Sequence, residues 1–337
     1  MIDPKLPFID LHRHLEGCVR LETMLDLASQ HGLHLPGETV ETLRPHVVMD
    51  GPQADLVSFL DHLHWMIYSL ADLDACRRIA YESVEDAAKE GIDYLELRFS
   101  PLFMAQPHKL APADVVAAVV DGVKAGERQF GVMTRLIGIM SRTYGPKSCQ
   151  RELEALLAHR HELRALDLAG DEARWPGELF HNHFRLGRDA GWQITVHAGE
   201  AGGAANVRYA IEQLGATRIG HGIRATEDPE LLDIIRERGI GLEINLTSNL
   251  QTNTVSSLDR HPIAYFLDQE LLATINTDDP IISGIDLRHE FANVAPLAGV
   301  TPTHARRAQE NALTTAFLSG TERSELITRF ANKAAVT

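Results

Sequence analysis

The sequence predicts an α/β fold, a (β/α)8 TIM barrel with a helical insertion after the first strand and extra C-terminal helices. Three observations predict it: eight short apolar segments recur along 337 residues, amphipathic stretches separate most of them, and no Gly/Ser-rich linker divides the chain. Eight alternating strand and helix units favour a closed barrel over an open doubly wound sheet. We therefore expect one domain over residues 1–337.

The predicted strands are short apolar runs bounded by turn residues. They cover residues 8–15, 92–100, 132–141, 163–171, 193–200, 218–223, 240–249 and 271–280. The stretches between them have helical periodicity. One example is "DACRRIAYESVEDAAKEG", in which Cys76, Ile79 and Val84 share one face and a glycine closes the helix.

The first connection, about residues 18–73, is far longer than an ordinary strand-to-helix connection. Within it, "DLVSFLDHLHWMIYSL" places Leu56, Phe59, Leu60, Leu63 and Ile67 at helical intervals. The connection should contain at least two helices and lie over the mouth of the barrel as a lid.

Four pairs of histidines have H-x-H spacing: His12/His14, His62/His64, His159/His161 and His181/His183. Residues two apart point the same way on a strand and nearly opposite ways on a helix. "LPFIDLHRHL" predicts a strand, whereas "ELEALLAHRHELRAL", "GELFHNHFRLGRDAG" and the stretch around His62 predict helices. Only His12 and His14 therefore remain a candidate chelating pair.

Composition excludes several classes of function. The formal net charge is −15, with 47 acidic and 32 basic residues, and this argues against nucleic acid as a partner. Three widely spaced cysteines make neither a disulfide framework nor a thiolate zinc site. The N-terminus has no secretory pattern and no apolar run has the length of a membrane span, so we expect a cytoplasmic protein that does not bind membranes.

Polar residues stand at the C-terminal ends of four predicted strands, where barrel enzymes place their functional groups. They are His12 and His14 at the first strand, His197 and Glu200 at the fifth, His221 at the sixth, and Asp278 and Asp279 at the eighth. Three imidazoles and one carboxylate form a good site for a borderline divalent ion, most often zinc. Such an ion with an open position lowers the pKa of bound water toward ~7.

The other polar residues of this group have two interpretations each. Glu200 can move a proton to a substrate ring nitrogen, or it can cap the helix near Ala204. His221 and Asp279 can orient water or substrate, or they can pack beneath a loop and form a turn before a proline.

Several alternative chemistries lack their motifs. There is no H-E-x-x-H, and His14-x-Glu16 has no P-C-x-x-C partner of the cytidine-deaminase type. Phosphate-loop and dinucleotide-binding fingerprints are also missing. The fourth strand ends in "LDLAGDE", without a lysine to bridge two ions, so one metal ion is favoured.

The stretches "DLHRHLEG", "LELRFSP", "LDLAGDE", "TVHAGE", "IGHGI", "LTSN" and "INTDDP" occur in this order from residue 10 to about residue 280. Together they resemble the adenosine deaminase family of the amidohydrolase superfamily. The resemblance implies one Zn²⁺ per chain, with the ligands His12, His14, His197 and Asp278. It also implies that Glu200 donates a proton to purine N1, that His221 lies beside the attacking hydroxide, and that Asp279 contacts the water and N7.

The resemblance further implies substrate contacts from His14, from Glu16 and from the backbone N–H of Gly170, which would serve N3. It implies an apolar gate on the helix that carries Leu56, Phe59, Leu60 and Leu63. The implied activity is the zinc-dependent hydrolytic deamination of adenosine and 2′-deoxyadenosine to inosine and 2′-deoxyinosine plus ammonia, in purine salvage. The partner is then a small purine nucleoside.

Glu16 departs from the family pattern, in which an aspartate usually stands beside the sugar 5′-hydroxyl. Adenine-deaminating relatives carry glutamate there, so adenine deamination is the alternative, and Arg20 would be the nearest partner for such a glutamate. "LDLAGDE" follows the nucleoside enzymes instead and favours adenosine. Deamination of another amino-heterocycle, and an inactive barrel that uses its ion only for stability, also remain open.

Overall fold

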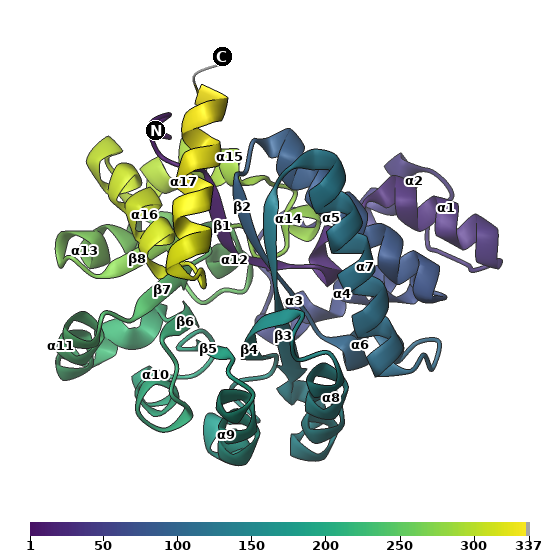
Figure 1. The fold of residues 1–337 in the computed structure, drawn as a ribbon, viewed down its shortest axis with the longest axis horizontal. Coiled ribbons are helices and arrows are strands. Elements are labelled where there is room, and N and C mark those ends of the chain that lie inside the picture. Colours follow the sequence, from purple (N-terminus) through teal and green to yellow (C-terminus); the bar gives the residue numbers. More distant parts are fainter. Residues whose placement is uncertain (335–337) are drawn as a thin grey trace.

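Eight parallel strands pair in sequence order around a barrel, and helices surround them (Figure 1). The structure, a computed structural model, describes residues 1–334. The strands are β1 (Ile9–His14), β2 (Tyr94–Phe99), β3 (Met133–Ser141), β4 (Leu163–Ala169), β5 (Gln193–Ala198), β6 (Arg218–His221), β7 (Gly241–Ile244) and β8 (Leu272–Ile275). Each lies within one of the eight predicted segments, and the predicted barrel is confirmed.

The barrel is closed between its last and first strands by backbone contacts just past β8. Asp278 N–H donates to the His12 carbonyl at 2.8 Å, and His14 N–H donates to the Asp278 carbonyl at 2.8 Å. Arg13 and Asp278 thereby form a parallel bridge. The closure therefore brings Asp278, which follows the last strand, beside His12 and His14 of the first strand.

The first connection carries four helices before the long helix that precedes β2. They are α1 (Leu21–His31), α2 (Val40–Val47), α3 (Leu56–Asp61) and α4 (Leu63–Tyr68). Leu56, Phe59, Leu63 and Ile67 are buried, as the helical spacing predicts, whereas Leu60 is half-buried. The single helix expected here is divided at His62, which ends α3 and precedes α4. The role of this segment as a lid stays a prediction.

The other helices alternate with the strands and continue after the last one. They are α5 (Leu73–Glu90), α6 (Pro101–Ala105), α7 (Pro112–Phe130), α8 (Pro146–Ala158), α9 (His181–Asp189), α10 (Ala204–Tyr209), α11 (Pro229–Arg238), α12 (Leu246–Gln251), α13 (Ile263–Asp268), α14 (Pro280–Ser283), α15 (Leu287–His289), α16 (Pro302–Thr315) and α17 (Gly320–Ala334). Single-turn 3-10 helices include η1 (Glu16–Cys18) and η6 (Leu258–Arg260). The predicted C-terminal helices are α16 and α17, and α17 lies near the N-terminus (Figure 1).

One helix prediction is wrong. The stretch 152–166 does not stay helical through His159 and His161, because α8 ends at Ala158 and β4 begins at Leu163. Backbone pairing of β4 with β3 takes residues that the local apolar pattern assigned to the helix. His159 and His161 therefore lie in a turn between helix and strand, and neither belongs to the polar group at the strand ends.

Two further expectations concern the whole chain. No helix among residues 1–334 is long and apolar enough to cross a membrane. Cys18, Cys76 and Cys149 are buried free thiols, which agrees with the predicted lack of a disulfide framework. The last three residues of the expected domain 1–337 lie outside the described residues.

Candidate metal centre and substrate cavity

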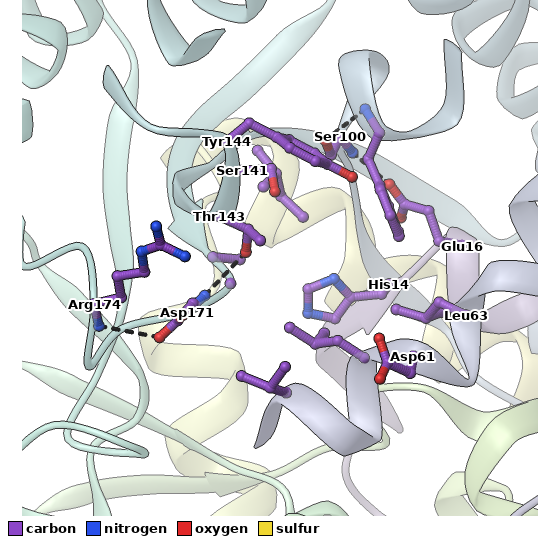
Figure 2. A pocket seen from close by; sticks show the side chains of 16 residues that line it. His14, Glu16, Asp61, Leu63, Ser100, Ser141, Thr143, Tyr144, Asp171 and Arg174 are labelled. Carbon is purple, nitrogen blue, oxygen red and sulfur yellow. Dashed lines mark hydrogen bonds between the residues drawn. The ribbon is translucent and has the colours of Figure 1, made fainter. Parts of the chain in front are cut away.

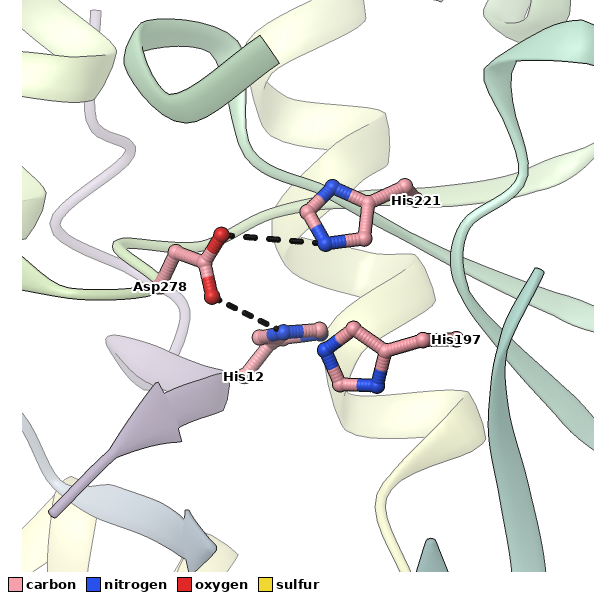
Figure 3. A group of neighbouring side chains, drawn as sticks. All are labelled: His12, His197, His221 and Asp278. Atoms are coloured by element: carbon pink, nitrogen blue, oxygen red, sulfur yellow. Dashed lines mark ion pairs between the residues drawn. The ribbon is translucent and has the colours of Figure 1, made fainter. Parts of the chain in front are cut away.

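Three imidazoles and one carboxylate converge at the C-terminal end of the barrel (Figure 3). One ligand atom each from His12, His197, His221 and Asp278 lies within 4.8 Å of all the others, and all four residues are buried. They come from β1, β5, β6 and the segment after β8. Nitrogen and oxygen donors at this spacing suit a borderline divalent cation such as zinc.

His14 belongs to the same group from the cavity side, where it is half-buried. Its Nε2 lies 3.3 Å from His12 Nε2, 3.2 Å from His197 Nε2 and 3.2 Å from Asp278 Oδ1. Strand geometry therefore brings His12 and His14 together, as the spacing predicts. The predicted set with His14 and the set with His221 overlap in three residues.

Backbone geometry at two of these residues is unusual. His221 has φ 61° and Asp278 has φ 65°, in the left-handed region that non-glycine residues rarely adopt. Such conformations persist where surrounding contacts hold them, and they are frequent at functional sites. For Asp278, the two hydrogen bonds to β1 provide that support.

Carboxylates behind two of the imidazoles set their orientation. His12 Nδ1 lies 2.8 Å from Glu243 Oε2, and His197 Nδ1 lies 3.1 Å from Asp167 Oδ1. A carboxylate can only accept, so each Nδ1 carries the proton and each Nε2 lone pair faces the other ligands. Burial lowers the pKa of His197 to about 4, which keeps its ring neutral for ligation.

Arg98 joins these two carboxylates across the barrel interior. Its guanidinium lies 2.8 Å from Asp167 and 2.7 Å from Glu243, and all three side chains are fully buried. Burial alone would raise the pKa of Glu243, but the charges of Arg98 and Arg218 hold it well below its usual range. Both carboxylates therefore stay ionised. The sequence pattern identifies none of these three residues, because a charged side chain within a mostly apolar strand is their only signal.

Glu200 lies at the edge of the cluster with its carboxyl aimed at His221. The distance from Glu200 Oε2 to His221 Nε2 is 3.6 Å, and His221 Nε2 is 3.7 Å from Asp278 Oδ2. Both distances exceed a direct hydrogen bond. Burial raises the pKa of Glu200 well above its usual value, and the charges of Asp278 and Glu172 raise it further. A carboxyl protonated at neutral pH can donate a proton.

Glu172, at the end of β4, holds the loop that carries Glu200. Its carboxylate accepts from the backbone N–H groups of Gly199, Glu200 and Gly202 at 2.8, 3.1 and 2.7 Å. It also accepts from Asn206 Nδ2 at 3.0 Å. Glu172 is the last residue of "LDLAGDE". The sequence does not reveal its role, because the loop that it binds follows a different strand.

The capping alternative for Glu200 and the turn alternative for Asp279 find no support in their contacts. Ala204 N–H faces Glu227, at 3.4 Å, instead of Glu200. Asp279 precedes α14 without a side-chain capping bond, and its Oδ1 is buried with no hydrogen-bond partner among the described residues. Arg20, the expected partner of Glu16 in an adenine-type site, pairs instead with Glu85 at 2.7 Å and with Asp86 at 2.5 Å.

A cavity of about 300 Å³ opens beside His14 (Figure 2). It is lined by His14, Glu16, Val57, Leu60, Asp61, Leu63, Ser100, Phe103, Ile139, Ser141, Thr143, Tyr144, Ala169, Gly170, Asp171 and Arg174. Asp171 and Arg174 lie across the cavity from Glu16 and Leu63 (Figure 2). Of the expected gate residues, Leu60 and Leu63 reach the cavity, whereas Leu56 and Phe59 pack in the core.

Two predicted substrate contacts border this cavity. Glu16 accepts from Ser100 N–H at 2.6 Å through Oε1, while its Oε2 is buried without a partner among the described residues. Gly170 has φ 106°, and a Cβ there would collide with Thr143 Oγ1, so only glycine fits. An anchored carboxylate with one free oxygen is suited to accept from a bound hydroxyl group.

Comparisons with known proteins agree with this geometry. The family model described as adenosine deaminase matches residues 7–333. A curated adenosine deaminase from Serratia proteamaculans is 56% identical over 326 residues, which cover 97% of this chain and 98% of that protein.

Two solved structures share the fold at lower identity. A crystal structure of adenine deaminase from Arthrobacter aurescens has a TM-score of 0.89 at 26% identity, covering 98% of this chain and 99% of the other. A structure of an amidohydrolase from Burkholderia ambifaria with bound Zn has a TM-score of 0.85 at 26% identity, covering 99% and 94%.

Proposed function

The chain belongs to the adenosine deaminase family, and we propose that it hydrolyses adenosine and 2′-deoxyadenosine to inosine and 2′-deoxyinosine with release of ammonia. It is an enzyme, a hydrolase acting on a purine substrate. The observation that carries the assignment is 56% identity to an adenosine deaminase over nearly the whole of both chains. A role in purine salvage and the cytoplasmic location stay predictions.

We assign one Zn²⁺ per chain to His12, His14, His197 and Asp278. The support is the donor set: two imidazoles fixed by carboxylates with Nε2 inward, a third imidazole 3.2 Å from His197, and a buried carboxylate. When bound, zinc supplies Lewis-acid chemistry that makes water nucleophilic at neutral pH. A bound zinc in the B. ambifaria structure favours the same metal here.

The surrounding residues provide the proton transfers and the orientation. Burial raises the pKa of Glu200 and so favours its protonated form, and Glu200 delivers that proton to N1 of the purine, which makes C6 a better electrophile. His221 and Asp279 hold the attacking water on the face of C6, and Asp279 also contacts N7. The N–H of Gly170 donates to N3, and the pocket wall of His14 and Glu16 contacts the rest of the nucleoside.

Glu16 decides between nucleoside and base. Its Oε1 is fixed by Ser100 N–H, and its Oε2 is free to accept from the 5′-hydroxyl. Arg20, the partner expected if Glu16 filled the ribose site, is engaged by Glu85 and Asp86 instead. These contacts favour adenosine. Adenine remains the second candidate, because the glutamate itself and the A. aurescens structure point to it.

The test is kcat/KM for adenosine, 2′-deoxyadenosine and adenine on one preparation, with ammonia release as a second readout. We expect both nucleosides ahead of adenine by up to ~10⁴, the discrimination that a site-to-hydroxyl hydrogen bond can give. Glu16→Asp should keep this order, and the exposed Glu154→Asp is the matched control. If adenine is the best substrate and Glu16→Asp restores nucleoside activity, the enzyme is an adenine deaminase.

A further inference from the structure

A chain of hydrogen bonds runs from the first turn of α13 to His221. The backbone N–H of Ile263 donates to His261 Nδ1 at 3.1 Å, and His261 Nε2 lies 3.1 Å from Asn249 Oδ1. Asn249 Nδ2 then lies 2.9 Å from His221 Nδ1. All three side chains are buried, and His261 and Asn249 are not among the cavity-lining residues.

Only one placement of protons satisfies this chain. A backbone N–H donates and cannot accept, so His261 Nδ1 carries a lone pair. Burial lowers the pKa of His261 to about 3, which keeps the ring neutral and places its single proton on Nε2. That Nε2–H donates to Asn249 Oδ1. The opposite orientation of the amide would set its NH₂ against the Nε2–H, two donors facing each other.

The amide of Asn249 therefore donates to His221 Nδ1. A second amide nitrogen, Asn245 Nδ2, lies 3.4 Å from the same atom. With Nδ1 accepting, the proton of a neutral His221 ring resides on Nε2. His12 and His197 have the opposite arrangement, because carboxylates take their Nδ1 protons and leave Nε2 free to bind a metal.

We propose that His261 and Asn249 are positioning residues that fix His221 as the Nε2–H tautomer and so keep it out of the metal's coordination shell. His221 then presents a hydrogen-bond donor to the space between Glu200 and Asp278. The tautomer decides between the donor set with His14 and the donor set with His221. A protonated Nε2 has no lone pair with which His221 could bind the ion. The consequence for catalysis rests on the proposed function, whereas the tautomer itself does not.

The direct test is nitrogen NMR of the protein labelled with ¹⁵N-histidine, in metal-free and zinc-loaded form. The His221 signals are assigned by their loss in His221→Asn. We expect an unprotonated Nδ1 and a protonated Nε2 in both forms. A protonated Nδ1, or a direct zinc contact at His221 Nε2, overturns the proposal. This measurement needs no substrate, so it is independent of whether the protein deaminates adenosine.

Variants test the chain of hydrogen bonds from His261 through Asn249 to His221. Asn249→Asp replaces the donor to His221 Nδ1 with an acceptor of the same shape, and should move the His221 proton to Nδ1. We expect kcat for adenosine to fall by roughly 10², the low end for acid–base groups, with KM within a few-fold of wild type and the zinc content unchanged. Asn293→Asp makes the same change at an exposed Asn–His pair, where Asn293 Nδ2 lies 3.0 Å from His289 Nδ1, and should change nothing.

His261 is tested with a matched pair of substitutions. His261→Gln keeps an N–H donor near Nε2 and should retain most of the turnover, whereas His261→Leu removes the donor and should lower kcat as Asn249→Asp does. If His261→Leu lowers stability but leaves the His221 signals and kcat unchanged, the proposal fails. Absence of activity in the wild type would refute the proposed function. The NMR measurement would then still test the His221 tautomer.

Discussion

At the scale of single residues, buried groups around the cluster fix where protons lie. Glu243 and Asp167 accept the Nδ1 protons of His12 and His197, and the amide of Asn249 donates to His221. In a buried site these hydrogen bonds are strong, because little water competes for the groups. These partners suit the imidazoles of His12 and His197 to act as metal ligands and the imidazole of His221 to act as a hydrogen-bond donor.

Glu200 gives the sharpest prediction at this scale. Glu200→Gln keeps the size and the buried position but removes the acidic proton that the raised pKa of Glu200 favours. We expect kcat for adenosine to fall by ~10²–10⁴, the usual value of general acid catalysis, while the dissociation constant of a non-reactive purine nucleoside stays within a few-fold. Near-normal turnover in Glu200→Gln would remove this residue from the proton-transfer step, and the exposed Glu154→Gln serves as the control.

At the scale of elements, the ends of the strands position the cluster, and β6 does so through a residue without a side chain. A Cβ on Gly220 would lie 3.1 Å from His12 Cε1 and 3.3 Å from His197 Cα. Such separations are tighter than ordinary packing, so a neighbour must move. The glycine in β6 therefore makes room for an imidazole ring that belongs to β1.

Gly220→Ala should consequently weaken the metal site more than the fold. The added methyl group displaces the His12 ring, and we expect zinc affinity to fall by roughly 10- to 100-fold, as for changes that disturb ligand orientation. Competition with a chromogenic chelator measures this affinity, and circular dichroism monitors folding. Gly320→Ala, where a Cβ would meet nothing within 4 Å, should leave the zinc affinity unchanged. Equal zinc affinities for both variants would show that the His12 ring accommodates the added methyl group without displacement.

At the scale of the whole molecule, the candidate metal site lies where the barrel closes. The ligands we propose belong to β1, β5 and the segment after β8, and Asp278 also forms the backbone bridge to Arg13. An ion bound only by the folded state stabilises it by mass action. Ligands from both ends of the strand series therefore couple metal binding to the stability of the closed barrel.

Removal of the metal should lower the melting temperature. With zinc at one hundred times its dissociation constant, the linkage amounts to about 2.7 kcal/mol, so a strong chelator should lower Tm by several degrees. Elemental analysis should give one zinc per chain. His12→Ala should lose both the zinc and the response of Tm to the chelator, whereas His62→Ala, between α3 and α4, should keep both. Two ions per chain, or a fully metallated His12→Ala, would contradict the assigned ligand set.

The sequence alone determined the barrel and pointed to the polar residues at the C-terminal ends of its strands. Apolar segments with their flanking helices predicted all eight strands, because a strand and a helix differ in local periodicity. The same local geometry separated His12 and His14 from three other H-x-H pairs. It failed at His159 and His161, where pairing of β4 with β3 ends the helix before its apolar pattern ends.

Only the tertiary structure decided which side chains from distant strands touch. Asp167, Glu243 and Arg98 are charged residues in three different strands that the sequence does not connect, and Glu172 binds a loop that follows another strand. The chain of hydrogen bonds from His261 through Asn249 to His221 joins residues that are 12 and 28 positions apart. Local periodicity carries no information on such contacts, because they depend on how neighbouring strands are aligned and on where the chain closes the barrel.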